Sequence, residues 1–268
     1  MSIKHYENFP VASWLFPRDL APTVLALYQF ARNADDIADE GDIDRQTRLD
    51  ALQACGEDFG ALTPFITLHN LDTQHLHDLL SAFKQDVWFD VERLYYDEMS
   101  ELLDYCMRSA NPVGRLMLQL FKVNDAEAVA ASDEICTALQ LINFWQDIAI
   151  DADKIRVYVP EDTLEEYGYT PESILYALPE TVLQEKYRQM MRALCNDVEN
   201  RMLAGKTLLP YLRGRFKLEI ACTIAGGLRI LSKLRSVDYD VLNHRPVLNA
   251  WDRCMLVLHG IRLCVAPH

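Results

Sequence analysis

Apolar residues recur at helical spacing along almost the whole chain, and this pattern limits the fold more than any other feature. In the stretch TVLALYQFARNADDIAD, apolar side chains occupy positions 24, 25, 27, 28, 30, 31 and 34, as on the buried side of an amphipathic helix. Alternating β-branched residues are scarce, and only 10 of the 268 residues are glycine. The pattern predicts an all-α protein of about ten helices.

The chain shows no Gly/Ser-rich linker, low-complexity tract or shift in composition, so we expect one domain over residues 1–268. Half of the residues are apolar, enough for a large core. We expect the main helices at 23–39, 44–55, 73–88, 97–121 with a break at NPVG, 132–151, 180–208, 214–236 and 247–264. Shorter helices are expected after Pro64, at 161–168 and after Pro171.

The formal net charge of −14 and the lack of a basic stripe argue against a nucleic-acid partner. Seven cysteines without a CxxC pair indicate reduced thiols in a cytoplasmic protein, not a disulfide framework or a zinc site. No signal peptide and no spanning helix are expected, so any membrane contact would be peripheral, at the inner face. The basic residues of 227–235 are interpreted as a solvated helix face, because the net charge opposes attraction to anionic lipid.

Aspartates gather at the ends of two apolar helices. Asp35 and Asp39 are four residues apart, and so are Asp147 and Asp151, which places each pair on one helix face. Asn143 precedes Asp147 by four residues and extends the second face. The first pair alone is typical of a solvated helix end. The second pair is separated by apolar Ile148, Ala149 and Ile150, which instead favours a buried, strongly negative cleft.

Four carboxylates cannot all stay ionised in a low-dielectric cleft unless cations neutralise them. Oxygen ligands favour hard divalent ions, and Mg²⁺ commonly bridges carboxylates to substrate phosphates. Arg32, Lys154 and Arg156 lie close to the aspartates in sequence and could bind phosphate oxygens directly. No Walker-type glycine loop is present, so a nucleotide is not expected. The pattern therefore predicts a diphosphate substrate bound through Mg²⁺, with an apolar interior for a hydrocarbon tail.

Two stretches, DDIAD and NFWQDIAIDADKIRVYVP, resemble the two aspartate-rich motifs of the squalene/phytoene synthase family of head-to-head prenyl synthases. The resemblance extends over nearly the whole chain. HYENFPVASWLFP and SANPVGRLML are most similar to the branch of hydroxysqualene synthases, which act in hopanoid biosynthesis. The motif pair is specific for the family, and the branch assignment rests on fewer residues.

The resemblance implies an all-α isoprenoid-synthase fold with a central apolar cavity between the motifs and several Mg²⁺ ions bound with the diphosphate. Carried over, the catalytic metal ligands are Asp35, Asp39, Asp147 and Asp151, together with Asn143 as a further ligand. The implied substrate contacts are His5, Asn8, Tyr28, Arg32, Gln140, Gln146, Lys154, Arg156 and Tyr158. The tyrosines Tyr95, Tyr96 and Tyr105 could line the cavity or simply belong to the core.

Three positions depart from the condensing synthases of the family. Gln146 stands where an arginine is common, Asn8 where a serine is common, and Met107 where a tyrosine is common. These departures match the branch that converts presqualene diphosphate and water to hydroxysqualene and pyrophosphate, without NADPH. The alternatives are synthesis of squalene, dehydrosqualene or presqualene diphosphate from farnesyl diphosphate, or a non-catalytic scaffold role. The expected partners are the isoprenoid diphosphate and other enzymes of squalene and hopanoid synthesis.

Overall fold

The structure is a computed structural model that describes residues 17–39, 43–92, 95–182 and 184–265. These residues form thirteen α-helices and two short 3₁₀ helices, and the described ranges contain no strand. The helices are α1 (Ala21–Asp39), α2 (Arg45–Glu57), α3 (Thr63–His69), α4 (Gln74–Glu92), α5 (Met99–Ser109), α6 (Asn111–Leu120), α7 (Ala126–Gln146), α8 (Ile148–Asp153), α9 (Glu161–Glu166), α10 (Pro171–Val182), α11 (Glu185–Ala204), α12 (Gly214–Ser236) and α13 (Ala250–Val265), with η1 (Gly60–Leu62) and η2 (Gly205–Tyr211). The all-α prediction is confirmed.

Two predicted helices are divided, which raises the count above ten. The expected helix at 97–121 breaks at Ala110 into α5 and α6, as the NPVG sequence predicted. The expected helix at 132–151 instead begins at Ala126, because the side chain of Asp125 caps it by accepting from the Glu127 backbone N–H. It ends at Gln146, and the short helix α8 follows at once.

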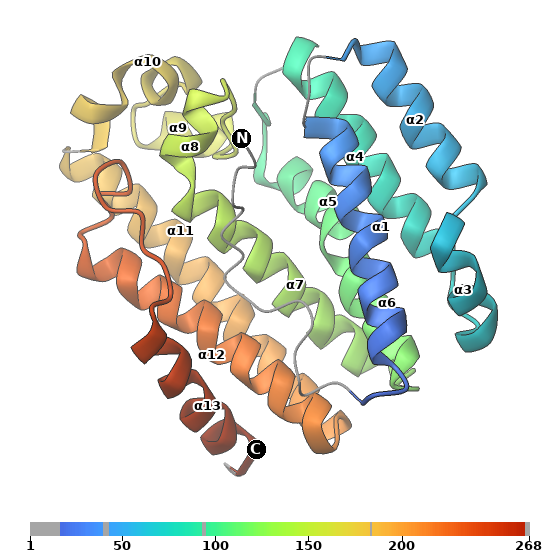
Figure 1. The fold of residues 1–268 in the computed structure, drawn as a ribbon. Helices are drawn as coiled ribbons and strands as arrows, with labels where there is room; N and C mark the ends of the chain where they lie inside the picture. The colour runs from blue at the N-terminus through green and yellow to red at the C-terminus, as the bar shows by residue number, and fades with distance from the viewer. Residues whose placement is uncertain (1–16, 40–42, 93–94, 183, 266–268) are drawn as a thin grey trace.

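Helix α7 lies in the middle of the fold and contacts α5, α6, α8, α11, α12 and η2. Eleven of its residues are buried, which include the fully buried Trp145. Its apolar side chains join those of α11 and α12 in the largest core cluster. In Figure 1, α1 to α6 lie on one side of α7, and α11 to α13 lie on the other.

Two neighbours of α7 approach it through glycine. A Cβ at Gly114 of α6 would meet the side chains of Ser132 and Cys136, and a Cβ at Gly205 of η2 would meet Ile135. Only glycine allows the backbones of α6 and η2 to lie this close to α7. The position of α7 is therefore fixed from two different elements.

Two smaller clusters hold the N-terminal helices together. Val24 and Ala26 of α1 pack with residues of α4 and α6, whereas Ala34 and Ala38 pack against α2 and α4. The buried residues of α1 lie near its two ends, on one side of the helix, and Asp35 and Asp39 lie on another side. No helix in the described ranges is long and apolar enough to cross a bilayer.

A candidate active site at the ends of helices α1 and α7

One face of α1 carries four of the predicted site residues. Tyr28, Arg32, Asp35 and Asp39 follow one another at helical spacing, so their side chains lie in a row. Arg32 donates to a carboxylate oxygen of Asp35 at 3.2 Å and pairs with Asp36 at 2.7 Å. Tyr28 lies at the other end of the row, on the wall of an apolar cavity.

The second motif keeps its predicted alignment although the helix is divided. The backbone N–H of Asp147 donates to the Asn143 carbonyl at 2.9 Å, and that of Asp151 donates to the Asp147 carbonyl at 2.8 Å. This spacing of hydrogen bonds is that of an α-helix, so the three side chains share one face across the junction of α7 and α8. Asn143 is exposed, and Asp147 and Asp151 are half-buried.

The structure brings the two motifs together through the loop after α8. The Arg156 guanidinium donates to both carboxylate oxygens of Asp39, at 3.0 and 3.1 Å. The Lys154 ammonium lies 4.0 Å from the same carboxylate. A bidentate pair of this kind fixes both orientation and distance. The acidic end of α1 therefore lies next to the loop that follows the second motif.

The loop reverses its direction at Ile155, whose φ of 60° lies in the left-handed region. A β-branched residue rarely adopts this conformation, which costs of order 1–3 kcal/mol. The Arg156 backbone N–H closes the turn by donating to the Asp151 carbonyl at 2.8 Å. The strained turn directs Arg156 back across the second motif to Asp39.

Negative charge is concentrated in this site. Burial and the adjacent charge of Asp147 raise the pKa of Asp151 to about 7, while Lys154 and Arg156 oppose the increase. Asp39 also contributes to the increase, which indicates that the carboxylates of the two motifs act on one another electrostatically. A carboxyl group with this pKa gains strongly from a bound cation.

Asp86 of α4 is a further acidic residue of the site that the sequence analysis missed. Its carboxylate is buried and accepts a hydrogen bond from the Tyr105 hydroxyl at 2.9 Å. Burial raises its pKa to about 8, against the lowering effect of the Tyr105 hydrogen bond, and the charges of Asp39 and Asp35 add to the increase. The signal in the sequence was an aspartate on the apolar face of the helix formed by AFKQDVWF.

Aromatic rings surround the Asp86–Tyr105 pair. Tyr158, a predicted substrate contact, stacks on Phe144 with ring centroids 3.8 Å apart, and Phe144 lies 6.2 Å from Tyr105. Tyr96 lies 6.1 Å from Tyr105 and 6.4 Å from Tyr158. Tyr96 and Tyr105 therefore belong to a buried aromatic wall behind the acidic residues. Met107 is exposed on α5 and lies outside this wall.

Arg245 is a second residue of the site that the sequence analysis missed. It lies in the segment between α12 and α13 and donates to both oxygens of Asp147, at 2.5 and 3.0 Å. The neighbouring Gln146 is buried, and its side-chain nitrogen donates to the Pro246 carbonyl. The sequence signal for this contact is a single arginine in the stretch NHRPVL. Its distance along the chain from Asp147 follows no helical or motif spacing, so the sequence does not connect the two residues.

The remaining predicted contacts are distributed as follows. Gln140 is half-buried on α7, one turn before Asn143, and Lys154 is exposed in the loop. His5 and Asn8 lie outside the described residues. The roles assigned to these residues, and to Gln146 and Tyr158, stay predictions.

An apolar cavity of about 320 Å³ adjoins the row of side chains on α1. It is enclosed by α1, α4, α6 and α12, and its lining residues are Val24, Leu27, Tyr28, Ala31, Leu76, Leu79, Val113, Leu116, Met117, Phe216, Glu219, Ile220 and Thr223. Because Tyr28 and Ala31 precede Arg32 on the same helix, the cavity leads toward the acidic end of α1. This combination suits a ligand with a charged head and an apolar tail.

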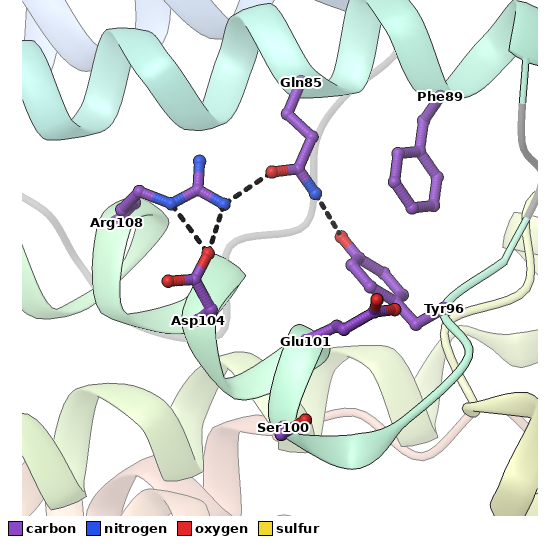
Figure 2. Close-up of a pocket in the computed structure, with 7 residues that line it drawn as sticks. All are labelled: Gln85, Phe89, Tyr96, Ser100, Glu101, Asp104 and Arg108. Carbon is purple, nitrogen blue, oxygen red and sulfur yellow. Dashed lines mark hydrogen bonds and ion pairs between the residues drawn. The ribbon is translucent and has the colours of Figure 1, made fainter.

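A separate polar pocket of about 360 Å³ lies between α4 and α5 (Figure 2). Two guanidinium nitrogens of Arg108 donate to one carboxylate oxygen of Asp104. Arg108 also donates to the side-chain amide oxygen of Gln85 at 2.5 Å, and the side-chain nitrogen of Gln85 donates to the Tyr96 hydroxyl at 3.4 Å. The buried ring of Tyr96 thus belongs both to the aromatic wall of the site and to the lining of this pocket.

The donor set fits Mg²⁺. The side chains that face the site from α1, α7 and α8 include four carboxylates and one amide, which are the ligands of a hard divalent cation. Within the described ranges, no three carboxylate, imidazole or thiolate groups converge on one point. Arg156 and Arg245 instead hold Asp39 and Asp147. A metal ion at these aspartates would therefore compete with the two arginines for the carboxylate oxygens.

Comparisons with known proteins agree with this architecture. Residues 3–252 match the profile of the squalene/phytoene synthase family. A hydroxysqualene synthase from Sinorhizobium fredii is 33% identical over 95% of this chain and 87% of its own length. One from Zymomonas mobilis is 40% identical over 61% of this chain, and the chain spans 58% of that relative's length.

A solved structure of squalene synthase HpnC from Alicyclobacillus acidocaldarius is 34% identical and superimposes with a TM-score of 0.76. The superposition covers 88% of this chain and 90% of the HpnC chain. The family match over residues 3–252 includes both aspartate motifs. This chain belongs to the squalene/phytoene synthase family.

Proposed function

We propose that this protein is a Mg²⁺-dependent hydroxysqualene synthase, which converts presqualene diphosphate and water to hydroxysqualene and pyrophosphate. The observation that carries the proposal is the Arg156–Asp39 pair, which joins the two aspartate motifs at the acidic end of α1. The apolar cavity adjoins Tyr28 at the other end of the same row of side chains. The relatives named hydroxysqualene synthase, at 33% and 40% identity, support the choice of reaction within the family.

Asp35, Asp39, Asn143, Asp147 and Asp151 would hold the metal ions. Bound there, Mg²⁺ would neutralise the carboxylates and stabilise the negative charge of the departing pyrophosphate. Arg32, Lys154, Arg156 and Arg245 are the cations beside these residues, and their guanidinium and ammonium groups would bind the diphosphate oxygens.

The two parts of the substrate would bind in different parts of the site. The diphosphate would occupy the acidic end of α1 and α7, and the hydrocarbon would enter the cavity past Tyr28. The bond between the substrate carbon and the diphosphate oxygen breaks, and its electron pair leaves with pyrophosphate. The apolar lining would exclude most water from the resulting carbocation.

Product formation requires one water molecule. Its oxygen bonds to the carbocation and one proton is released, which gives the alcohol. Tyr96 belongs both to the buried aromatic wall and to the lining of the polar pocket between α4 and α5, and the polar groups of that pocket could position this water.

Product analysis tests the proposal. Purified protein is incubated with Mg²⁺ and no reductant, with presqualene diphosphate or with farnesyl diphosphate, in water enriched in ¹⁸O. The expected product from presqualene diphosphate is hydroxysqualene that carries the label, with no product from farnesyl diphosphate. Consumption of farnesyl diphosphate would instead assign the chain to a condensing synthase. No turnover of either substrate by folded protein would favour a non-catalytic role.

A further inference from the structure

The outer face of α13 presents a continuous apolar stripe. Trp251, Cys254, Leu258, Ile261 and Val265 are spaced alternately three and four residues apart, which places them along one line on the helix. Trp251 is 70% exposed, Leu258 60% and Val265 78%. The opposite face, which contains Asp252, Leu256 and Gly260, is buried against the rest of the protein. The stripe, defined by these five residues, therefore has no covering element among the described residues.

The position of α13 is firmly set. Asp252 is buried and pairs with Arg229 at 2.7 Å and Lys233 at 2.6 Å, both on α12. Asn249 and Asp252 also cap the helix reciprocally, each side chain accepting the other's backbone N–H at 2.8 and 2.9 Å. These contacts hold α13 against α12 with the stripe outward. The exposure of the stripe is therefore a property of the docked helix and not of a frayed end.

Positive charge accompanies the stripe. Arg253 and Arg262 are exposed and lie on its two sides, and the only acidic residue of α13, Asp252, is buried in its ion pairs. The charge of the whole chain is also strongly segregated. Residues 205–268 contain 10 Lys and Arg against 4 Asp and Glu, whereas residues 1–204 contain 16 against 36. The net charge of −14 thus conceals a C-terminal region of +6.

We propose that the stripe of α13 binds the surface of an anionic lipid bilayer, with α13 lying in the plane of the interface. An exposed apolar helix face with a tryptophan at one end and arginines on both sides is typical of interfacial helices. The C-terminal region has the sign of charge that anionic lipid attracts, and each basic residue near such a surface contributes to binding.

The charge of the C-terminal region and the small area of the stripe both argue against a second copy of the chain as the partner that covers the stripe. Pairing through the stripe would oppose two regions of +6. Stable dimers bury about 800 Å² per partner, and five side chains along a single helix supply roughly half of that area. A bilayer instead accepts a narrow stripe and neutralises the positive charge.

The location of the stripe also suits the proposed substrate, and this step alone depends on the proposed function. Gly260 of α13 lies against Cys222 of α12, and the neighbouring α12 residues Phe216, Ile220 and Thr223 line the apolar cavity. The C-terminal end of α13 and the cavity therefore adjoin the same half of α12 on different sides. Docking of α13 would bring the cavity close to the lipid that dissolves an isoprenoid diphosphate.

Vesicle sedimentation tests the inference without substrate or metal. Purified full-length protein is mixed with vesicles of phosphatidylcholine alone, or with about 30% phosphatidylglycerol, and the pelleted fraction is measured at about 0.05 and 0.5 M salt. We expect binding to the anionic vesicles that weakens at high salt, and little binding to phosphatidylcholine.

The double variant Leu258→Ser with Ile261→Ser should lower this binding at least about tenfold, because it removes two membrane-facing apolar side chains. Leu68→Ser, at a leucine of α3 that is 72% exposed, is the matched control and should bind like the parent. Arg253→Gln with Arg262→Gln provides a second test if the first variant does not fold, and it should reduce binding most at low salt.

Three results would overturn the inference. The parent could fail to bind either vesicle, or the stripe variants could bind as well as the parent. Light scattering could also show a dimer that the stripe variants dissociate, which would assign the stripe to a second copy. Because the assay contains no substrate, loss of vesicle binding and loss of synthase activity are independent outcomes.

Discussion

Arg156 and Asp39 form a bidentate ion pair across 117 positions of the sequence, with N–O distances of 3.0 and 3.1 Å. Asp39 ends α1, and Arg156 follows the strained turn after α8. A second arginine, Arg245, holds Asp147 in the same way. Each aspartate motif thus has an arginine bound to one of its carboxylates, and both arginines come from segments outside the helices.

Replacement of Arg156 by glutamine should lower kcat/KM for presqualene diphosphate by about 100-fold or more, because it removes a charged donor from the diphosphate site. Arg156→Lys should restore little, since an ammonium cannot form the fork. Arg115→Gln is the matched control, because Arg115 makes a similar fork with Asp133 at 3.0 and 2.6 Å away from the site. Equal losses in the two glutamine variants would contradict the assignment.

Asp147→Asn should abolish turnover and leave the fold intact, because it removes the charge of a proposed metal ligand from a site where negative charges repel one another. The readouts are steady-state activity and the increase in Tm that Mg²⁺ with pyrophosphate gives the parent. The increase should be absent in the variant and retained in Asp133→Asn. Unchanged activity in Asp147→Asn would rule out the metal-ligand role.

The stability of the metal-free protein should depend on Asp151. Its pKa is raised to about 7 in the folded state, whereas an unfolded aspartate has a pKa of about 3.9. The folded state therefore binds the proton more tightly, and this contribution to stability is lost as the pH rises from about 4 through about 7.

Mg²⁺ should offset this loss, so the increase in Tm on adding the metal should be larger at pH 8 than at pH 6. Thermal unfolding with and without Mg²⁺ at both pH values measures the effect. Asp151→Asn should reduce the difference between the two pH values. If the metal-free parent and variant show the same pH dependence, the assigned pKa is wrong.

Asp86→Asn should have little effect on Tm at pH 7 and should stabilise the protein above pH 8. Burial raises the pKa of Asp86 to about 8, so at pH 7 the carboxyl is mainly neutral and an amide resembles it. At pH 9 the parent carries a buried carboxylate and the variant does not. Tyr105→Phe, which removes the hydrogen bond of 2.9 Å, is the comparison variant and should lower stability at both pH values. A large loss of stability in Asp86→Asn at pH 7 would indicate an ionised carboxylate.

Gly205→Ala should lower the free energy of unfolding by about 1–3 kcal/mol, the usual cost of overpacking. The added Cβ would meet the Ile135 side chain of α7. Chemical denaturation measures the change. A double variant that also carries Ile135→Ala should lose less than the sum of the two single losses, because the shortened side chain makes room for the new methyl group. Full additivity would mean that the two residues are not in contact.

The sequence predicted the helices well because apolar spacing is a local signal. The spacing of four also led to the prediction that Asp35, Asp39, Asp147 and Asp151 share one metal site, because it places each pair on one helix face. The Arg156–Asp39 pair brings the end of the first motif to the loop after the second, and the shared metal site stays a prediction. The boundaries at Asp125 and Asp147 were less predictable. The Asp125 side chain caps α7, so this helix begins earlier than its apolar pattern suggests. At Asp147 one helix ends and the next begins, but the backbone hydrogen bonds keep their helical spacing.

Asp86 and Arg245 could not be found in this way. Each is a single charged residue without a spacing relation to a partner, and only the packing of α4 and of the segment before α13 brings them to the site. The stripe of α13 was obscured for another reason. The net charge of the whole chain suggested a surface that repels anionic lipid, although the charge is divided between two regions of opposite sign.

The glycine contacts at Gly114 and Gly205 have a mechanical consequence for the site. The backbones of α6 and η2 at these glycines lie against side chains of α7. A shift of α7 along or about its axis would therefore press these side chains against the two backbones. Asn143, whose backbone carbonyl accepts from the Asp147 N–H, thus lies on a helix that is held in place. If a diphosphate binds, we expect the two short segments that carry Arg156 and Arg245 to move, because both lie outside the helices.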